Sequence, residues 1–205
     1  MVAYFFFSAA AVVGLYLAII AGPIIILLGG IGLFFAYFHV APPLRLGYRG
    51  LGLSELGIFL SFGVLPVAGS FYVQAGHVSV LSLVLGIPIG FLTTSVLINH
   101  DQIFFDAYQK GSKMSLTVTL GRRRAMVTAF ILTAASFAMI PLAIALRLLP
   151  VSTLLVLATI PLFVNQIKLY RTPAQSPLHY VKLTQTTFVL STVFGILLAL
   201  GLLLG

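Results

Sequence analysis

The placement of the charged residues constrains this chain more than any other feature. Its 205 residues include eleven lysines and arginines and only three acidic residues. None of these lies in residues 1–44 or in residues 56–100. A helix needs ~20 apolar residues to cross the ~30 Å hydrocarbon core of a bilayer. Because each run is about twice that length, we expect each to form two membrane-spanning helices joined by a short turn.

Three further charge-free runs, 125–146, 148–167 and 183–205, each predict one crossing. The composition agrees, since 60% of the residues are hydrophobic and 7% are charged. A transmembrane barrel would show short alternating segments, and these runs are continuous. We therefore predict an all-α integral membrane protein, a bundle of about seven transmembrane helices forming a single domain over residues 1–205. The expected helices lie near residues 2–21, 24–40, 54–74, 78–99, 124–146, 149–167 and 184–204.

Short turns are expected at Gly22-Pro23, at Gln74–His77 and at Leu149-Pro150, because glycine ends helices and proline begins them. The remaining connections are longer and polar: 41–53, 100–123 and 168–183. With the adjoining Arg124, they hold every lysine and arginine except Arg147. The positive-inside rule places these main loops in the cytoplasm, with the N-terminus cytoplasmic and the C-terminus outside.

The formal net charge of +8 is explained by this topology and by attraction to anionic lipid headgroups. Nucleic acid is excluded as a partner, because no basic face lies outside the membrane plane. The run Arg122-Arg123-Arg124 has the same explanation, with phosphate or diphosphate binding as the alternative. A transporter or channel is disfavoured, since no charged residue lies mid-membrane.

The chain has three acidic residues, all on the expected cytoplasmic side: Glu55, Asp101 and Asp106. Asp101 and Asp106 share the loop 100–123 with Lys110 and Lys113. Mg²⁺ prefers one or two carboxylates together with substrate phosphate oxygens, and the lysines would neutralise a leaving diphosphate. The two aspartates are thus a candidate metal pair. The alternative is that they cap or salt-bridge a surface loop.

Two segments carry a family resemblance. In the first, Tyr48-Arg49-Gly50-Leu51-Gly52 precedes Glu55-Leu56 and an apolar stretch that ends at Ser70-Phe71-Tyr72-Val73-Gln74. In the second, Asn99 precedes Gly111, Lys113, Ser115-Leu116, Val118 and Leu120-Gly121. Both resemble motifs of the UbiA superfamily of membrane prenyltransferases, most closely its 1,4-dihydroxy-2-naphthoate polyprenyltransferase branch, over about residues 20–205.

The resemblance implies a helical bundle, usually of nine membrane helices, with two aspartate-rich cytoplasmic loops that hold an isoprenoid diphosphate through Mg²⁺. Ionisation gives an allylic cation, which an aromatic acceptor attacks. No catalytic residue is assigned. The implied site is Asn99, Asp101 and Asp106 for Mg²⁺, with Arg49, Lys110 and Lys113 as diphosphate contacts.

The chain departs from the family pattern in two ways. Seven helices against nine fits the absence of the first two, and residues 1–54 contain no N-x-x-x-D-x-x-x-D pattern. The family aspartates, four and eight residues before Gly111, are replaced by Ala107 and Ile103. Asp101 and Asp106 would lie ~140° apart on a helix, so they converge on one ion only in an irregular loop.

Two functions therefore stay open at this level. The first is Mg²⁺-dependent polyprenyl transfer to an aromatic quinone precursor. The second is a non-catalytic subunit, derived from a prenyltransferase, that holds a quinone, pigment or lipid in a larger membrane complex. The expected partners are the lipid bilayer, an isoprenoid or quinone-like ligand and other membrane subunits. The expected location is the bacterial inner (plasma) membrane.

Overall fold

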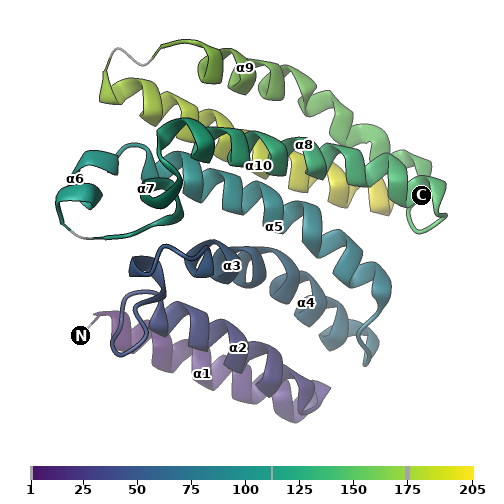
Figure 1. Cartoon of the computed structure of the whole chain (residues 1–205). Coiled ribbons are helices and arrows are strands. Elements are labelled where there is room, and N and C mark those ends of the chain that lie inside the picture. Colours follow the sequence, from purple (N-terminus) through teal and green to yellow (C-terminus); the bar gives the residue numbers. More distant parts are fainter. Residues whose placement is uncertain (1, 112, 174–175) are drawn as a thin grey trace.

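The computed structural model describes residues 2–111, 113–173 and 176–205, and its regular elements within them are helices (Figure 1). In chain order these elements are α1 (Val2–Ala21), α2 (Ile24–Phe38), η1 (Leu46–Tyr48), α3 (Leu53–Phe59), η2 (Leu60–Val64), α4 (Leu65–Ala75), α5 (Val80–Asp101), α6 (Phe105–Lys110), α7 (Leu116–Leu120), α8 (Arg122–Ala145), η3 (Val151–Thr159), α9 (Ile160–Arg171) and α10 (Pro177–Leu203).

All seven predicted apolar segments are helical. Six of the helices in the described ranges are long and apolar enough to cross a membrane. The seventh, α2, is a shorter apolar helix of 15 residues, about 22 Å at 1.5 Å per residue. The helical membrane fold is confirmed, and its second predicted span is shorter than a bilayer core.

Two of the long spans are not uniform α-helices. The span Leu53–Ala75 contains α3, the π-helical η2 and α4. Pro66, in the first turn of α4, has no amide hydrogen to donate to the preceding turn, and η2 is the wider turn that comes just before it. The span Val151–Arg171 begins as the 3₁₀-helical η3 and continues as α9.

The predicted short turns are confirmed. Gly22 has φ +116° between α1 and α2, and Gly76 has φ +74° after α4, values that favour glycine. The predicted loop 168–183 is wrong, because α9 continues to Arg171 and α10 begins at Pro177. Proline at the first helical position was an available signal. With 27 residues, α10 is longer than a bilayer core requires.

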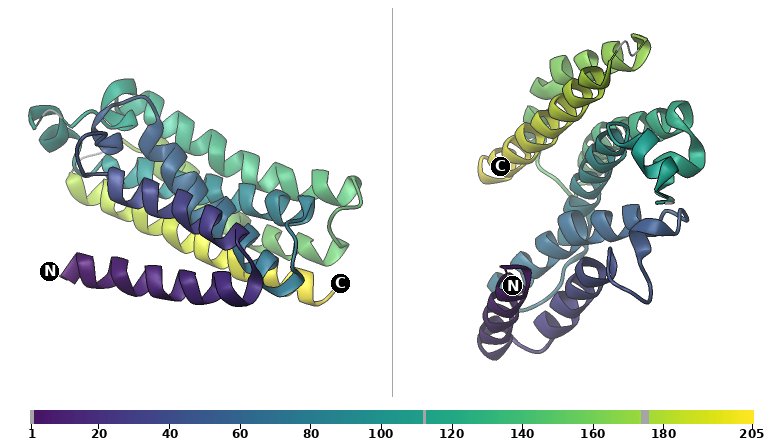
Figure 2. Two further views of the ribbon diagram at one scale, coloured as in Figure 1. Left: turned by 90° about the horizontal axis from the view of Figure 1, so that it is seen from below. Right: turned by 90° about the vertical axis from the view of Figure 1, so that its left-hand side faces the viewer.

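The packed interior lies where α5, α8, η3 and α10 meet. Its buried side chains are Leu92, Ile140, Ala143, Leu149, Val156, Leu190, Phe194 and Leu198. Seen end-on, the helices lie in an open arc with α1–α2 and α9–α10 at its two ends (Figure 2). A cleft of about 370 Å³ between α3–η2, α5 and α10 is lined mainly by apolar side chains, with His100 among its lining residues.

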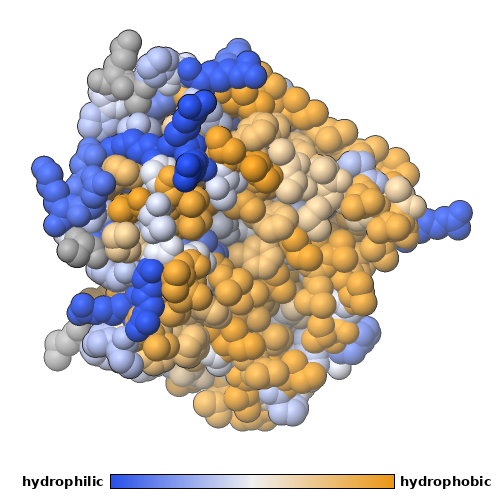
Figure 3. All heavy atoms as spheres, in the orientation of Figure 1, coloured by the Kyte–Doolittle hydropathy of each residue, from blue (hydrophilic) through white to orange (hydrophobic). Residues whose placement is uncertain are grey.

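Hydrophilic side chains gather at the end of the bundle that carries α6 and α7, while most of the remaining visible surface is hydrophobic (Figure 3). Farther along the bundle, glycines allow η2 and α5 to pack closely against each other. A Cβ atom on Gly63 of η2 would collide with the backbone of Gly90 and Gly86 in α5. This close contact holds α3, which directly precedes η2, against α5.

We expect Gly63→Ala to lower the free energy of unfolding by about 1–3 kcal/mol, because the added methyl group would push η2 and α5 apart. The matched control is Gly30→Ala, since a Cβ atom there would have no neighbour within 4 Å. Unfolding of both variants in mixed detergent micelles measures the difference. An equal loss in the two proteins would contradict this account of the contact.

Candidate functional site

Two buried carboxylates approach each other at the hydrophilic end of the bundle. Glu55, in the first turn of α3, is 5% exposed, and Asp101, the last residue of α5, is 3% exposed. The two groups are close enough to interact electrostatically, and both interact with Lys113. We call these three residues the Glu55–Asp101 site.

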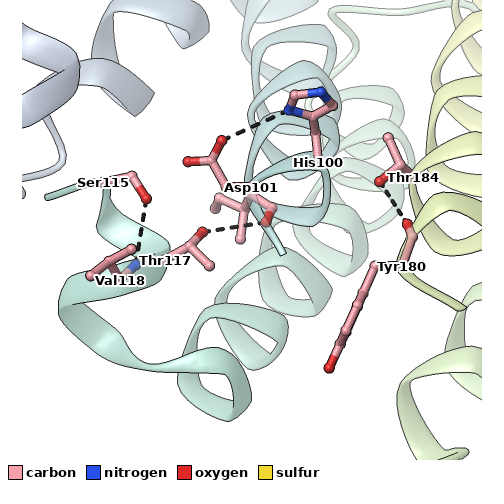
Figure 4. A network of polar contacts seen from close by, with 8 residues as sticks. His100, Asp101, Ser115, Thr117, Val118, Tyr180 and Thr184 are labelled. Carbon is pink, nitrogen blue, oxygen red and sulfur yellow. Dashed lines mark hydrogen bonds and ion pairs between the residues drawn. The ribbon is translucent and has the colours of Figure 1, made fainter. Parts of the chain in front are cut away.

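The Asp101 carboxylate has identifiable neighbours on both sides. Figure 4 shows it between the His100 ring and Ser115, with His100 Nδ1 3.8 Å from Asp101 Oδ1. The Ser115 hydroxyl lies beside it. Because Asp101 is at the C-terminal end of α5, the helix dipole disfavours its negative charge. The positive charge of Lys113 opposes this effect and stabilises the ionised form of Asp101.

The site forms because two loops that are far apart in the sequence dock on each other. Arg49 pairs through its backbone with Met114. Gly50, at φ +69°, lies so close that a Cβ atom would be 2.5 Å from Thr119 Oγ1. Gly52, at φ +74°, then caps the N-terminus of α3. The two segments that carry the family resemblance are thus in direct contact, and their contact brings Lys113 to Glu55.

Glu55 has an unusual environment. Neither of its carboxylate oxygens has a hydrogen bond of good geometry among the described residues, although the backbone amides of Glu55 and Leu116 lie nearby. Burying an ionised carboxylate without a partner costs about several kcal/mol of desolvation free energy. Carboxylate oxygens are also the protein ligands that Mg²⁺ prefers. The carboxyl groups of Glu55 and Asp101 therefore offer oxygens of the kind that suits a Mg²⁺ ion.

His39, just beyond α2, interacts electrostatically with Lys113 and Asp101 of this site. Burial lowers its pKa, the Lys113 charge lowers it further, and Asp101 offsets part of the effect. His39 and Glu55 are the two neighbours that sequence reasoning left out of the site. The signal for Glu55 was its place in the first family-like segment. Nothing in the spacing pointed to His39.

The predicted partner of Asp101 lies elsewhere. Asp106 is exposed and forms an ion pair with Arg122 at 3.0 Å. The Arg122 guanidinium also donates to the Gln102 carbonyl at 2.8 Å and lies over the rings of Phe105 and Tyr180. The structure therefore brings Asp101 together with Glu55, and it places Asp106 in an arginine-binding surface loop.

Asn99 is fully buried between helices. Its Nδ2 donates to Tyr170 Oη and to Thr187 Oγ1, each at 2.9 Å. Gln166 Nε2 donates to the same two oxygens, each at 3.0 Å. The amide of Asn99 thus joins α5 to α9 and α10, rather than facing the carboxylates.

The predicted diphosphate contacts also separate. Lys113 belongs to the site, with its Nζ 3.8 Å from the centre of the Tyr108 ring. Arg49 donates from Nε to the Leu44 carbonyl at 2.6 Å, so its side chain braces its own loop. Lys110 is exposed at the end of α6. Only Lys113 is positioned to neutralise charge beside Glu55 and Asp101.

Membrane-spanning helices with a carboxylate site at one end of the bundle define an integral membrane protein with a site suited to a cation or a cation-bound anion. The sequence pattern of the UbiA prenyltransferase family matches residues 2–185. The chain belongs to the UbiA prenyltransferase family. No solved structure matches it.

Three relatives place the chain more closely. A 1,4-dihydroxy-2-naphthoate octaprenyltransferase of Mycobacterium leprae is 32% identical over 114 residues, 56% of this chain and 38% of that protein. The Bacillus subtilis protein of the same name is 24% identical over 202 residues, 97% of this chain and 63% of that protein. A Synechocystis 2-carboxy-1,4-naphthoquinone phytyltransferase is 29% identical over 140 residues, 68% and 45% of the two chains. This chain thus spans between 38% and 63% of the length of these relatives. The predicted naphthoate branch is confirmed.

Replacing Asn99 by alanine should lower the thermal stability while leaving divalent-cation binding unchanged. The buried hydroxyls of Tyr170 and Thr187 each lose a hydrogen-bond partner, which costs about 1–3 kcal/mol. Differential scanning fluorimetry with and without Mg²⁺ separates the two effects. Thr192→Ala is the control, since that hydroxyl is exposed and bonds only within its own helix. Loss of the Mg²⁺-induced shift in Asn99→Ala would show instead that Asn99 serves the cation.

The lowered pKa of His39 predicts how the stability of the folded protein depends on pH. Because its pKa is lowered in the folded protein, the unfolded chain binds the proton more tightly, and stability contributed by neutral His39 is lost as the pH falls below about 6.5. The unfolding midpoint of the unmodified protein should therefore fall more between pH 7.5 and pH 5.5 than that of His39→Gln. Parallel curves for the two proteins would argue against a neutral His39 at the site.

Proposed function

We propose that this chain carries the reaction site of a membrane prenyltransferase. It would transfer a polyprenyl group from an isoprenoid diphosphate to an aromatic quinone precursor of the naphthoate class. The matched relatives are named as transferases acting on naphthoate-type acceptors. Those names favour transfer chemistry over the non-catalytic subunit.

One observation carries the proposal: the Glu55–Asp101 site lies beside the mouth of an apolar cleft. His100 links the two features, because it lines the cleft and lies 3.8 Å from Asp101. An isoprenoid diphosphate has the same two parts, a charged head and a long apolar tail. The arrangement suits a substrate whose head meets the carboxylates while its tail enters the cleft between α3–η2, α5 and α10.

Members of the UbiA family are generally Mg²⁺-dependent. The residues that would hold Mg²⁺ here are Glu55 and Asp101, through their carboxylate oxygens. When bound, the ion neutralises negative charge on the diphosphate. This assignment replaces the aspartate pair at 101 and 106 as the carboxylates proposed to bind the ion.

Side chains of the protein would assist the bond breaking and protect the cation that forms. Lys113 would stabilise the diphosphate as the carbon–oxygen bond breaks and both bonding electrons leave with the diphosphate oxygen. The allylic cation that remains is attacked by a carbon of the aromatic acceptor, which then loses its proton. The side chains of Ile58, Phe62 and Phe188 line the cleft. They would exclude the water that otherwise captures the cation.

The protein is integral to a membrane, and we propose the plasma membrane of a bacterium as its location, because bacterial relatives match it. The basic loops around the Glu55–Asp101 site would face the cytoplasm. Its proposed ligands are the isoprenoid diphosphate and a quinone-like aromatic. Other membrane subunits are further proposed partners.

Glu55→Gln should abolish Mg²⁺-dependent prenyl transfer, because it removes the charge and one of two ligands while keeping the side-chain size. Asp106→Asn is the matched control, since Asp106 pairs with Arg122 on the surface. The assay uses purified protein, isoprenyl diphosphates of several lengths and naphthoate acceptors, with Mg²⁺ or EDTA.

Retained transfer in Asp106→Asn and at least a ~100-fold loss in Glu55→Gln are the expected pair of results. The reverse pair would return the metal site to the aspartates of the surface loop. Absence of any product from a folded protein that still binds Mg²⁺ would favour the ligand-holding subunit.

A further inference from the structure

A second ligand site is built between α8 and α9 at the basic end of the bundle. The two helices separate toward that end (Figure 1), and a groove of about 270 Å³ lies between them. Apolar side chains form its wall, and two arginines stand at its mouth. The lining residues used here are Arg123, Arg171, Val127, Phe130 and Ile167.

The apolar wall is held in place by packing and hydrogen bonding. The Phe130 ring stacks on Phe163 of α9 with centroids 5.7 Å apart. Tyr170, which also lines the groove, is fixed by its hydroxyl bonds to Asn99 and Gln166. The groove is thus a preformed surface rather than a gap between mobile side chains.

The two arginines have no acidic partner among the residues that the structure describes. The sequence has only three acidic residues. Glu55 and Asp101 are buried in the site described above, and Asp106 pairs with Arg122. In the described part of the chain, no ion pair involves Arg123 or Arg171. Arg124 and Lys168, neighbours on the same two helices, add further positive charge.

We infer that this groove binds an anionic phospholipid. The phosphate would lie between Arg123 and Arg171, and an acyl chain would run along Val127, Phe130 and Ile167 into the membrane. Basic pockets between transmembrane helices at one membrane surface bind anionic headgroups in this way. Both helices belong to membrane-spanning segments, so the groove opens where lipid headgroups and acyl chains meet.

An isoprenoid diphosphate shares the charged head and apolar tail, but the groove suits it less well. Such a diphosphate brings a divalent cation, and no carboxylate lines the groove. The groove also shares no residue with the Glu55–Asp101 site or with the cleft that opens beside it. The inference does not depend on the proposed transferase function.

The test is native mass spectrometry of the full chain, purified in detergent and titrated with phosphatidylglycerol or phosphatidylcholine of identical acyl chains. We expect tighter binding of phosphatidylglycerol. Each of Arg123→Gln and Arg171→Gln should weaken it about fivefold. Lys182→Gln, an exposed cation at the same end but outside the groove, should leave it unchanged.

A fourth variant tests the groove itself. Val127 is about half exposed and lines it, so Val127→Trp should fill the apolar wall and weaken binding without changing any charge. Equal affinity for the two lipids, or equal weakening by Lys182→Gln, would overturn the inference. Displacement of phosphatidylglycerol by farnesyl diphosphate at lower concentration would also overturn it, in favour of a substrate site.

Discussion

The burial of Glu55 is the constraint on which the site depends. Nearby positive charge stabilises the ionised form of a carboxyl group that is 5% exposed and has no hydrogen-bond partner among the described residues. Lys113 supplies part of that positive charge. Gly50 packs closely against Thr119, which joins the two loops, and Gly63 packs against Gly90, which joins η2 to α5. Backbone packing that tolerates no side chain thus positions the charges, and a divalent cation would complete their compensation.

The aspartate spacing of this chain differs from the pattern of its family, and the proposed site uses a different pair of carboxyl groups. Asp106 is committed to Arg122, which fastens α6 to the start of α8. Glu55 supplies a second buried carboxyl group from α3, in addition to Asp101 at the end of α5. A carboxylate from another helix meets the same electrostatic need, because a cation recognises the charge and the oxygens whatever their place in the sequence.

The excess of positive charge is divided between two features of the bundle. At the Glu55–Asp101 site it is used inside the protein, through Lys113. At the groove between α8 and α9 it faces outward, through Arg123 and Arg171, beside apolar side chains of the membrane region. Both features lie at the same end of the bundle, where anionic groups from a substrate or a lipid can reach them.

The sequence alone determined the membrane fold and the family, because both follow from local patterns. Charge-free runs of helix-spanning length require crossings, and Gly22-Pro23 and Gly76 mark turns through backbone geometry. The motif segments at 48–56 and 99–121 identify the family without any knowledge of their contact. The basic residues of segment 168–183 predict a loop there, whereas Ser176-Pro177 indicates the helix start that the structure shows.

Only the tertiary structure decided which polar groups meet. Their shared loop indicates Asp101 and Asp106 as a candidate pair, but the segments at 46–52 and 113–119 dock on each other and bring the Lys113 charge to both Glu55 and Asp101. Asn99 was likewise placed by α9 and α10, whose side chains its amide bonds. Such partners lie up to 88 residues apart in the sequence, and their meeting depends on helix packing, which no local pattern records.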